Sequence, residues 1–115
     1  MADVESRVYK AGQMVFRERE IGDLAFIVKS GVVEIIKHGE DGKEILIGTV
    51  SKGGMFGEMA LIDDKPRMAS ARAKDDGTEL MVVTKELFDN KIKKADPFLR
   101  GMINILVDHV RKMSN

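Results

Sequence analysis

The residues best suited to chemistry lie in one stretch, residues 53–73, which reads GGMFGEMALIDDKPRMASARA. Gly57 lets the backbone approach a ligand closely, and the apolar residues 59–61 suit one helical turn whose free N–H groups can face a phosphate. Glu58 lies at the mouth of that turn. Arg67 follows behind a proline, and its guanidinium is shaped for bidentate contact with phosphate oxygens. These residues predict a site for a phosphate joined to a sugar.

Each of these residues also has a plainer interpretation. Arg67 alone would be a surface arginine after a turn, and Glu58 alone would be an acidic residue that stabilises a short helical turn by its charge. Asp63, Asp64 and Lys65 are typical of a solvated loop tip. We favour phosphate binding because the carboxylate, the glycine turn and the guanidinium occur together in one short stretch.

The composition argues against a general attraction for polyanions. The chain has 115 residues, which is enough for one domain with a substantial core and too few for a second. Lys plus Arg and Asp plus Glu both number 19, so the formal net charge is zero. A neutral chain has no overall field that draws in nucleic acid or an anionic membrane. We therefore expect neither as a partner, and attraction for an anion must be local.

The sequence offers little to a metal ion or to redox chemistry. It has no cysteine, which removes disulfides, thiolate catalysis and cysteine zinc sites. Its two histidines, His38 and His109, lie far apart with no carboxylate at metal-ligand spacing. The N-terminus lacks the apolar core of a signal peptide, and apolar runs are only a few residues long. We therefore expect a cytoplasmic protein without a metal or cofactor.

The elements that must position the site are mainly strands. Eleven glycines and short β-branched runs between turns indicate an all-β body over about residues 7–84. Residues 30–31 turn the chain between two apolar runs, which we expect to pair as a hairpin, and Asp41-Gly42 predicts a second hairpin. The charged residues 17–20 are typical of a solvated surface. The predicted strands cover residues 7–10, 14–16, 24–29, 32–38, 44–50, 70–73 and 79–84.

Two helices are predicted to follow the strands. Thr84 can cap a helix over residues 85–95, and Asp96-Pro97 is a start pattern for a second helix over residues 97–113. The predicted fold is therefore mainly β with C-terminal α: an eight-stranded antiparallel β-roll, or jelly roll, with a short helical turn in the anion-binding stretch and two terminal helices.

The last predicted helix has an unusually wide apolar face. Its apolar residues recur at helical spacing, at Phe98, Met102, Ile105, Leu106, Val110 and Met113. Such a face can contact its own barrel, a ligand or a second copy of the chain, so the helix could cap a ligand or form a homodimer. The sequence leaves these possibilities open.

Two motifs in the anion-binding stretch point to a family. Residues 56–61 are FGEMAL and residues 66–70 are PRMAS, so the arginine lies nine positions after the glutamate. This pair resembles the phosphate-binding cassette of the cyclic nucleotide-binding domain, which is found in protein kinase A regulatory subunits, gated ion channels and catabolite-activator transcription factors. Gly12, Gly22-Asp23 and residues 30–32 match turn positions of that family's β-roll. The resemblance predicts one stand-alone cyclic nucleotide-binding domain over residues 1–115.

The resemblance implies a role for each residue of the cassette. Glu58 would accept a hydrogen bond from the ribose 2′-hydroxyl, and Arg67 would pair with the exocyclic oxygens of the cyclic phosphate. The two side chains would neutralise each other when the pocket is empty. Backbone N–H groups of residues 57–60, and of residue 68 or 69, would complete the anion site. The ligand-binding residues implied are Phe56, Gly57, Glu58, Met59, Ala60, Arg67, Met68, Ala69 and Ser70.

The purine of such a ligand would need an apolar surface. In the family this surface comes from strand residues and from the last helix. The corresponding candidates here are Ile45, Ile47, Val50 and Phe56, with Phe98 or Met102 as a lid.

Two positions depart from the family's pattern. Gly54 stands where an acidic residue is common, and Met68 stands where a small or hydroxyl-bearing residue is usual. A threonine at the second position is typical of members that favour cGMP. Its absence favours cAMP as the ligand of this chain.

The leading interpretation is a non-catalytic sensor of a cyclic nucleotide, acting in signal transduction through a protein effector that the sequence does not identify. Hydrolysis of a cyclic phosphate needs a metal pair or an activated water with an acid–base partner, and no such cluster is visible. A cupin-type jelly-roll enzyme would need two or three histidines and a carboxylate on neighbouring strands. A degenerate fold kept as a structural or dimerisation module is a further alternative, against which the intact Glu58 and Arg67 argue.

The C-terminal boundary bears on the effector. Only five residues follow Val110, so we expect no appended DNA-binding, pore or kinase segment. A complete protein and a domain excised from a larger one both fit this sequence.

Overall fold

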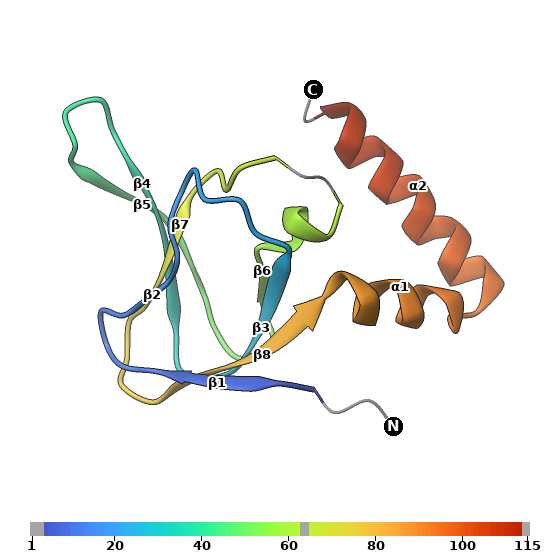
Figure 1. Ribbon diagram of the computed structural model, residues 1–115, viewed down its shortest axis with the longest axis horizontal. Helices are drawn as coiled ribbons and strands as arrows, with labels where there is room; N and C mark the ends of the chain where they lie inside the picture. Colours follow the sequence, from blue (N-terminus) through green and yellow to red (C-terminus); the bar gives the residue numbers. More distant parts are fainter. Residues whose placement is uncertain (1–3, 63–64, 114–115) are drawn as a thin grey trace.

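The computed structural model describes residues 4–62 and 65–113, without the side chains of residues 110, 111 and 113. In that part of the chain eight strands form two four-stranded antiparallel sheets, and two helices follow them (Figure 1). The strands are β1 (Ser6–Tyr9), β2 (Met14–Phe16), β3 (Leu24–Ser30), β4 (Val33–His38), β5 (Glu44–Val50), β6 (Met55–Phe56), β7 (Ser70–Ala73) and β8 (Thr78–Thr84). The helices are the 3-10 helix η1 (Glu58–Leu61), α1 (Lys85–Lys93) and α2 (Pro97–Met113). The predicted mainly-β roll is confirmed.

The two sheets have the strand orders β1-β8-β3-β6 and β2-β7-β4-β5. The hairpin predicted at Asp41-Gly42 is confirmed, because β4 pairs with β5 and Gly42 has a φ of 79°. Strand β6 has two residues and was not predicted, since so short a run carries no periodicity.

The predicted hairpin between residues 24–29 and 32–38 is wrong. β3 pairs with β6 and β8, whereas β4 pairs with β5 and β7 in the other sheet. Gly31, with a φ of 84°, makes the corner against buried Thr78, and a Cβ at Gly31 would lie 2.5 Å from the Thr78 hydroxyl. Apolar side chains of both strands, such as Phe26 and Val33, enter one core, so the strands face each other across it.

The core lies between the two sheets and holds the base of the site. It comprises Tyr9, Phe26, Val28, Val33, Phe56, Ala71, Ala73, Leu80 and Val82, with Phe16 among the half-buried residues packed against it. The rings of Phe16, Phe26 and Phe56 lie with centroids 5.4–6.1 Å apart. This aromatic group fixes the position of β6, and through it the turn that follows.

The predicted helix caps are confirmed. Thr84 Oγ1 accepts a hydrogen bond from the Leu87 N–H at 3.0 Å, and Asp96 Oδ1 accepts one from the Phe98 N–H at 2.8 Å. α1 ends at Lys93, two residues before the predicted end, and packs beside a small cluster formed with β3, β8 and η1. In the described residues no helix is long and apolar enough to cross a bilayer.

α2 contacts α1 and is separated from the two sheets in the view of Figure 1. Much of its predicted apolar face is exposed, with exposed fractions between 47% and 70% at Phe98, Leu99, Met102, Ile105 and Leu106. The side chains of Val110 and Met113, and the loop tip predicted at Asp63 and Asp64, lie outside the described residues.

Candidate functional site

A large cavity opens beside η1, against the face of β4 that points into the roll. Its volume is about 700 Å³, within the range of small-molecule sites. Eight of the nine predicted ligand-binding residues line it, and the ninth, Ser70, does not. The lining comprises Phe16, Ile35, Val50, Met55, Phe56, Gly57, Glu58, Met59, Ala60, Lys65, Pro66, Arg67, Met68 and Ala69. The fold therefore brings both halves of the sequence motif to one site.

Gly57 begins the first half of the site. Its φ is 74°, a left-handed conformation that side chains other than glycine rarely adopt. A Cβ there would also lie 2.9 Å from Nη1 of Arg67 and 3.2 Å from the ring of Phe16. Ala60 and Leu61 are buried and hold η1 in place, while the first amides of such a turn have no partner within the helix. The turn can therefore offer N–H groups to an anion.

Arg67 supplies the cation of the second half, and its guanidinium is held from three sides. Nη2 donates to the carbonyl oxygen of Leu24 at 2.7 Å, and Nη1 donates to that of Gly57 at 3.3 Å. Cζ lies 3.9 Å from the centroid of the Phe16 ring, a cation–π contact. Gly22 leaves room for the group, since a Cβ there would lie 2.7 Å from Nη2. The chain therefore builds a fitted support for this guanidinium.

The charge of Arg67 is only partly compensated. Burial lowers the pKa of its guanidinium from the ordinary value, and the carboxylates of Glu20 and Asp23 oppose that shift. Nε is buried and has no hydrogen-bond partner among the described residues. Of the five N–H donors of a guanidinium, two have carbonyl partners in that part of the chain. Because Nε is shielded, the donors left for oxygens of a ligand are the second N–H of Nη1 and the second N–H of Nη2.

Glu58 is exposed at the start of η1 and lines the same cavity. We expected it to neutralise Arg67 in the absence of a ligand, and this expectation is wrong. No ion pair links the two residues in the described chain, and the carboxylates that act on Arg67 belong to Glu20 and Asp23. The backbone carbonyls hold the guanidinium instead. The Glu58 carboxylate therefore stands apart at the rim of the cavity.

The apolar lining agrees in part with the predicted purine surface. Val50 and Phe56 line the cavity. Ile45 and Ile47, which precede Val50 on β5, do not, and their side chains are 52% and 57% exposed. Met68 is 69% exposed at the rim.

None of the described residues that line the cavity belongs to α2, so neither Phe98 nor Met102 covers it in this structure. Sequence reasoning also missed Phe16, Ile35, Met55 and Lys65, the last of which was predicted to lie in a solvated loop tip. Of these, Ile35 had a usable pattern, since it alternates with Glu34 along β4 and so faces the roll. Phe16 had none, because its role depends on contact with Arg67, which is distant in sequence.

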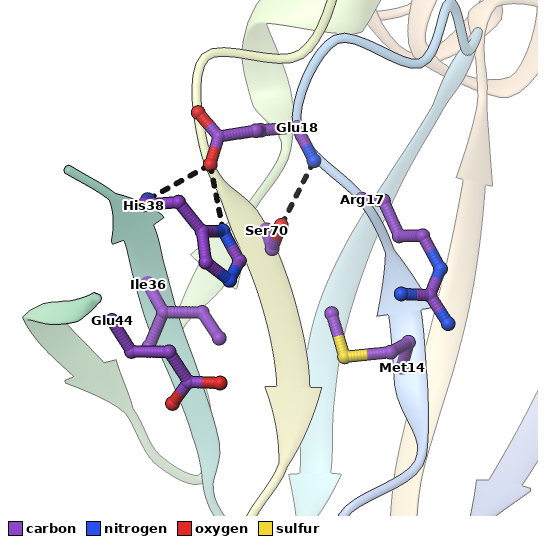
Figure 2. Close-up of a pocket in the computed structure, with 7 residues that line it drawn as sticks. All are labelled: Met14, Arg17, Glu18, Ile36, His38, Glu44 and Ser70. Atoms are coloured by element: carbon purple, nitrogen blue, oxygen red, sulfur yellow. Dashed lines mark hydrogen bonds and ion pairs between the residues drawn. The ribbon is translucent and has the colours of Figure 1, made fainter. Parts of the chain in front are cut away.

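Ser70 lies at a second, smaller pocket of about 240 Å³, shown in Figure 2. Ile36 also lines this pocket, whereas its neighbour Ile35 lines the large cavity, so the two hollows lie on opposite faces of one sheet. The Ser70 Oγ accepts a hydrogen bond from the Glu18 N–H at 2.9 Å. Within the described residues, no group of three or more His, Asp or Glu side chains is placed to hold a metal ion.

A two-sheet roll with a glycine turn, a carboxylate and a supported guanidinium around one apolar cavity defines a binding domain for a small anionic ligand. The family model of the cyclic nucleotide-binding domain matches residues 6–95. The chain belongs to this family, and its resemblance to it is confirmed.

Individual relatives agree with this assignment. The chain is 42% identical over 71 residues to a cAMP-dependent protein kinase regulatory subunit of Blastocladiella emersonii, covering 62% of this chain and 18% of the relative. It is 29% identical over 108 residues to the cyclic AMP receptor protein of Thermus thermophilus, covering 94% of this chain and 50% of the relative. The chain thus spans half or less of the length of these curated relatives.

Among solved structures, a half-site-occupied form of the EAL enzyme Bd1971 has a TM-score of 0.91 and 32% identity, over 98% of this chain and all of that one. Structures of the same enzyme bound to cAMP and to cGMP match with TM-scores of 0.74 and 0.75, at 33% and 34% identity. They cover 96% of this chain and 29% of each enzyme chain. These matches support a regulatory role for a domain of this family. Because the chain covers only 29% of the enzyme, the matches do not assign the enzyme's activity to it.

Proposed function

We infer that the chain is a cyclic nucleotide sensor that binds cAMP in preference to cGMP and performs no chemistry on it. The observation that carries this inference is the half-buried Arg67 guanidinium beside the large cavity, where one N–H on each of Nη1 and Nη2 has no protein partner in the described chain. A partly buried cation with unused donors is stabilised when an anion reaches it. The exocyclic oxygens of a cyclic phosphate supply both the charge and the acceptors.

Glu58 would select the sugar. Its carboxylate is exposed to the cavity and is not held by Arg67, so both of its oxygens can accept a hydrogen bond from a ribose 2′-hydroxyl. The N–H groups at the start of η1 would bind the remaining phosphate oxygens. Phe16, Ile35 and Val50 would then contact the base.

The absence of chemistry follows from the side chains around the cavity. The residues that line it in the described chain are apolar apart from Glu58, Lys65 and Arg67. Attack on a cyclic phosphate would need an activated nucleophile beside a general base, and these three do not form such a pair. Prolonged incubation with cAMP, followed by chromatography, is expected to return the cyclic nucleotide without 5′-AMP.

Calorimetric titration of the full chain with cAMP and cGMP tests the proposal. Arg67→Ala is expected to lose about 2–5 kcal/mol of binding, or roughly 30- to 4,000-fold, because it removes a desolvated partner of the phosphate. Its fold, checked by circular dichroism, is expected to persist. If neither nucleotide gave a saturable heat or raised the melting temperature at millimolar concentration, the sensor assignment would fail.

The role of Glu58 has its own test with 2′-deoxy-cAMP, which lacks the proposed hydrogen-bond donor. The natural chain is expected to bind it about tenfold more weakly than cAMP. Glu58→Ala is expected to bind the two nucleotides equally. If Glu58→Ala still bound cAMP about tenfold more tightly than 2′-deoxy-cAMP, the 2′-hydroxyl would be bound by a residue other than Glu58.

The preference for cAMP rests on the side chain at position 68. Met68 has no hydroxyl to bond the base or phosphate, so only its backbone N–H can serve the ligand. Met68→Thr is expected to raise the affinity for cGMP relative to cAMP. If the ratio of the affinities for cAMP and cGMP were the same in the natural chain and in Met68→Thr, the side chain at position 68 would not determine the selectivity.

The output of the sensor would come from α2. Its exposed apolar residues, Phe98, Leu99 and Met102 among them, can cover the base once a ligand is bound, and we expect this movement to be what an effector protein detects. The same exposed face also favours a second candidate function, a dimerisation module. Sedimentation velocity with and without cAMP measures the oligomeric state and distinguishes the two functions. A dimerisation module is expected to be a dimer already in the absence of cAMP.

A further inference from the structure

The backbone of Arg67 is held by the loop that joins β2 to β3. The Arg19 N–H donates to the Arg67 carbonyl oxygen at 2.7 Å, and the Arg67 N–H donates to the Glu20 carbonyl oxygen at 2.8 Å. Three residues further on, the Ser70 Oγ accepts from the Glu18 N–H at 2.9 Å. Residues 18–20, predicted to be a solvated surface, therefore run beside residues 67–70 and fix where the phosphate-binding arginine begins.

This loop has an unfavourable backbone conformation that needs support. Arg19 has a φ of 74°, and it is the one residue other than glycine with a positive φ in the described chain. Such a conformation persists in proteins where surrounding contacts hold it. The support must come from residues next to Arg19.

Glu18 supplies that support by tying the loop to β4. Its Oε1 accepts a hydrogen bond from the His38 N–H at 2.9 Å and lies 3.0 Å from His38 Nδ1 (Figure 2). These two contacts from His38, first the backbone one and then the ring, lower the pKa of the Glu18 carboxyl from its ordinary value. The carboxylate is thus stabilised in its charged form where it joins the loop to the sheet.

We propose that Glu18 and His38 are positioning residues for Arg67, and that protonation of His38 strengthens ligand binding through them. The inference rests on the proposed function for its ligand, but its structural step concerns the loop alone. An imidazolium donates a stronger hydrogen bond to a carboxylate than a neutral imidazole does. Protonation therefore favours the conformation in which Arg19 and Glu20 hold the backbone of Arg67.

The other charged groups around His38 do not compete with Glu18 for its ring. Glu44 is its neighbour across the β4–β5 pair and also lines the small pocket. Both Glu44 oxygens accept from Arg72 Nη1, at 2.9 and 3.1 Å, and Arg72 also contacts Glu34. The carboxylate of Glu44 is therefore already paired with a cation.

Two arginines lie next to Glu18 in the chain. Arg17 lines the small pocket, and Arg19 helps to lower the pKa of the Glu18 carboxyl. Both keep their positive charge over the range in which histidine titrates, roughly pH 5 to 8, as do the guanidinium of Arg67 and the negative charge of a cyclic phosphate. We therefore assign the expected pH dependence to His38.

Amide hydrogen exchange of the ligand-free chain tests the positioning step by itself. Glu18→Ala is expected to speed exchange of the Arg67 amide about tenfold or more, since that N–H donates to the loop. Glu18→Gln, which keeps an acceptor oxygen, is expected to have a smaller effect. Glu79→Gln is the control, because Glu79 pairs with Lys29 in the other sheet, 3.2 Å away. A folded Glu18→Ala protein with unchanged Arg67 exchange would overturn the inference, whether or not the chain binds a nucleotide.

The affinity for cAMP as a function of pH tests the second step. As the pH falls from about 8 to about 5.5, the affinity of the natural chain for cAMP is expected to rise by up to about fivefold. An effect of this size is what a partly exposed ion pair contributes. His38→Asn and Glu18→Gln are expected to abolish that dependence, and His109→Asn is expected to keep it. A pH dependence that vanished in His109→Asn, or survived in His38→Asn, would contradict the proposal. Failure to bind any cyclic nucleotide would contradict the proposed function and leave the exchange result to decide the positioning role.

Discussion

Replacing Gly22 by alanine tests the support of Arg67 without changing any group that would touch a ligand. Gly22 lacks a left-handed φ, so its backbone can accept an alanine. The new Cβ would lie 2.7 Å from Nη2, 3.1 Å from Nε and 3.2 Å from Cζ of Arg67. A contact of 2.7 Å is not tolerated, so the guanidinium must move by several tenths of an ångström.

The size of the effect follows from what that movement disturbs. The hydrogen bond from Nη2 to the Leu24 oxygen is charge-assisted, and such bonds contribute about 1.5–3 kcal/mol. The contact with the Phe16 ring contributes about 0.5–2 kcal/mol. Because the charge of Arg67 stays at the cavity, only part of its binding energy is lost. We expect Gly22→Ala to bind cAMP about 10- to 100-fold more weakly, an intermediate result between the natural chain and Arg67→Ala.

Gly48→Ala is the matched control. Gly48 lies on β5, also lacks a left-handed φ, and a Cβ there would have no heavy atom within 4 Å. Its affinity, measured by the same calorimetric titration, is expected to stay within about twofold of the natural value. If Gly22→Ala bound cAMP as tightly as Gly48→Ala while Arg67→Ala did not bind, the held position of the guanidinium would be irrelevant to binding.

Three further results are expected. Leu80→Ala, at a fully buried core position, should lower the free energy of unfolding by about 2–5 kcal/mol in urea titration, and a loss below 1 kcal/mol would contradict its place in the core. The Glu18 carboxyl has a folded-state pKa below its ordinary value of 4.5, so its stabilisation is complete above that pH and is lost as the pH falls through the lower value. Glu18→Gln should therefore flatten the fall in melting temperature between about pH 5 and pH 3, and an unchanged slope would deny the contact with His38. A chain ending at Ala95 should bind cAMP more weakly if α2 closes over the base, and equal affinity in a folded truncated chain would exclude that lid.

The fold was predictable where local patterns act alone. Helix caps at Thr84 and Asp96 depend on side chains that bond amides two or three residues away, and both appear as predicted. The turn at Asp41-Gly42 likewise depends on its own residues. The partner of β3 was not predictable from such patterns, because a strand with apolar side chains can either pair beside its neighbour or face it across a core. The corner at Gly31 against Thr78 decides between these arrangements, and Thr78 is remote in sequence.

The candidate site divides in the same way. The sequence by itself determined the cassette, since Gly57, Glu58 and Arg67 lie within one short segment whose spacing defines a family. Only the tertiary structure decided what holds the guanidinium. Its partners are two backbone carbonyls and the Phe16 ring, and a carbonyl belongs to every residue type, so no sequence pattern reports it.

The loop of residues 18–20 also shows the difference between what the sequence predicts and what the tertiary structure decides. Its charged side chains predicted a solvated segment, and Arg19 and Glu20 are indeed exposed. What binds Arg67 is the backbone of these residues, whose hydrogen bonds form only when β2, β4 and β7 are in place. Sequence therefore specified which groups could hold an anion, whereas the packing of distant strands decided where the arginine stands and which residues keep it there.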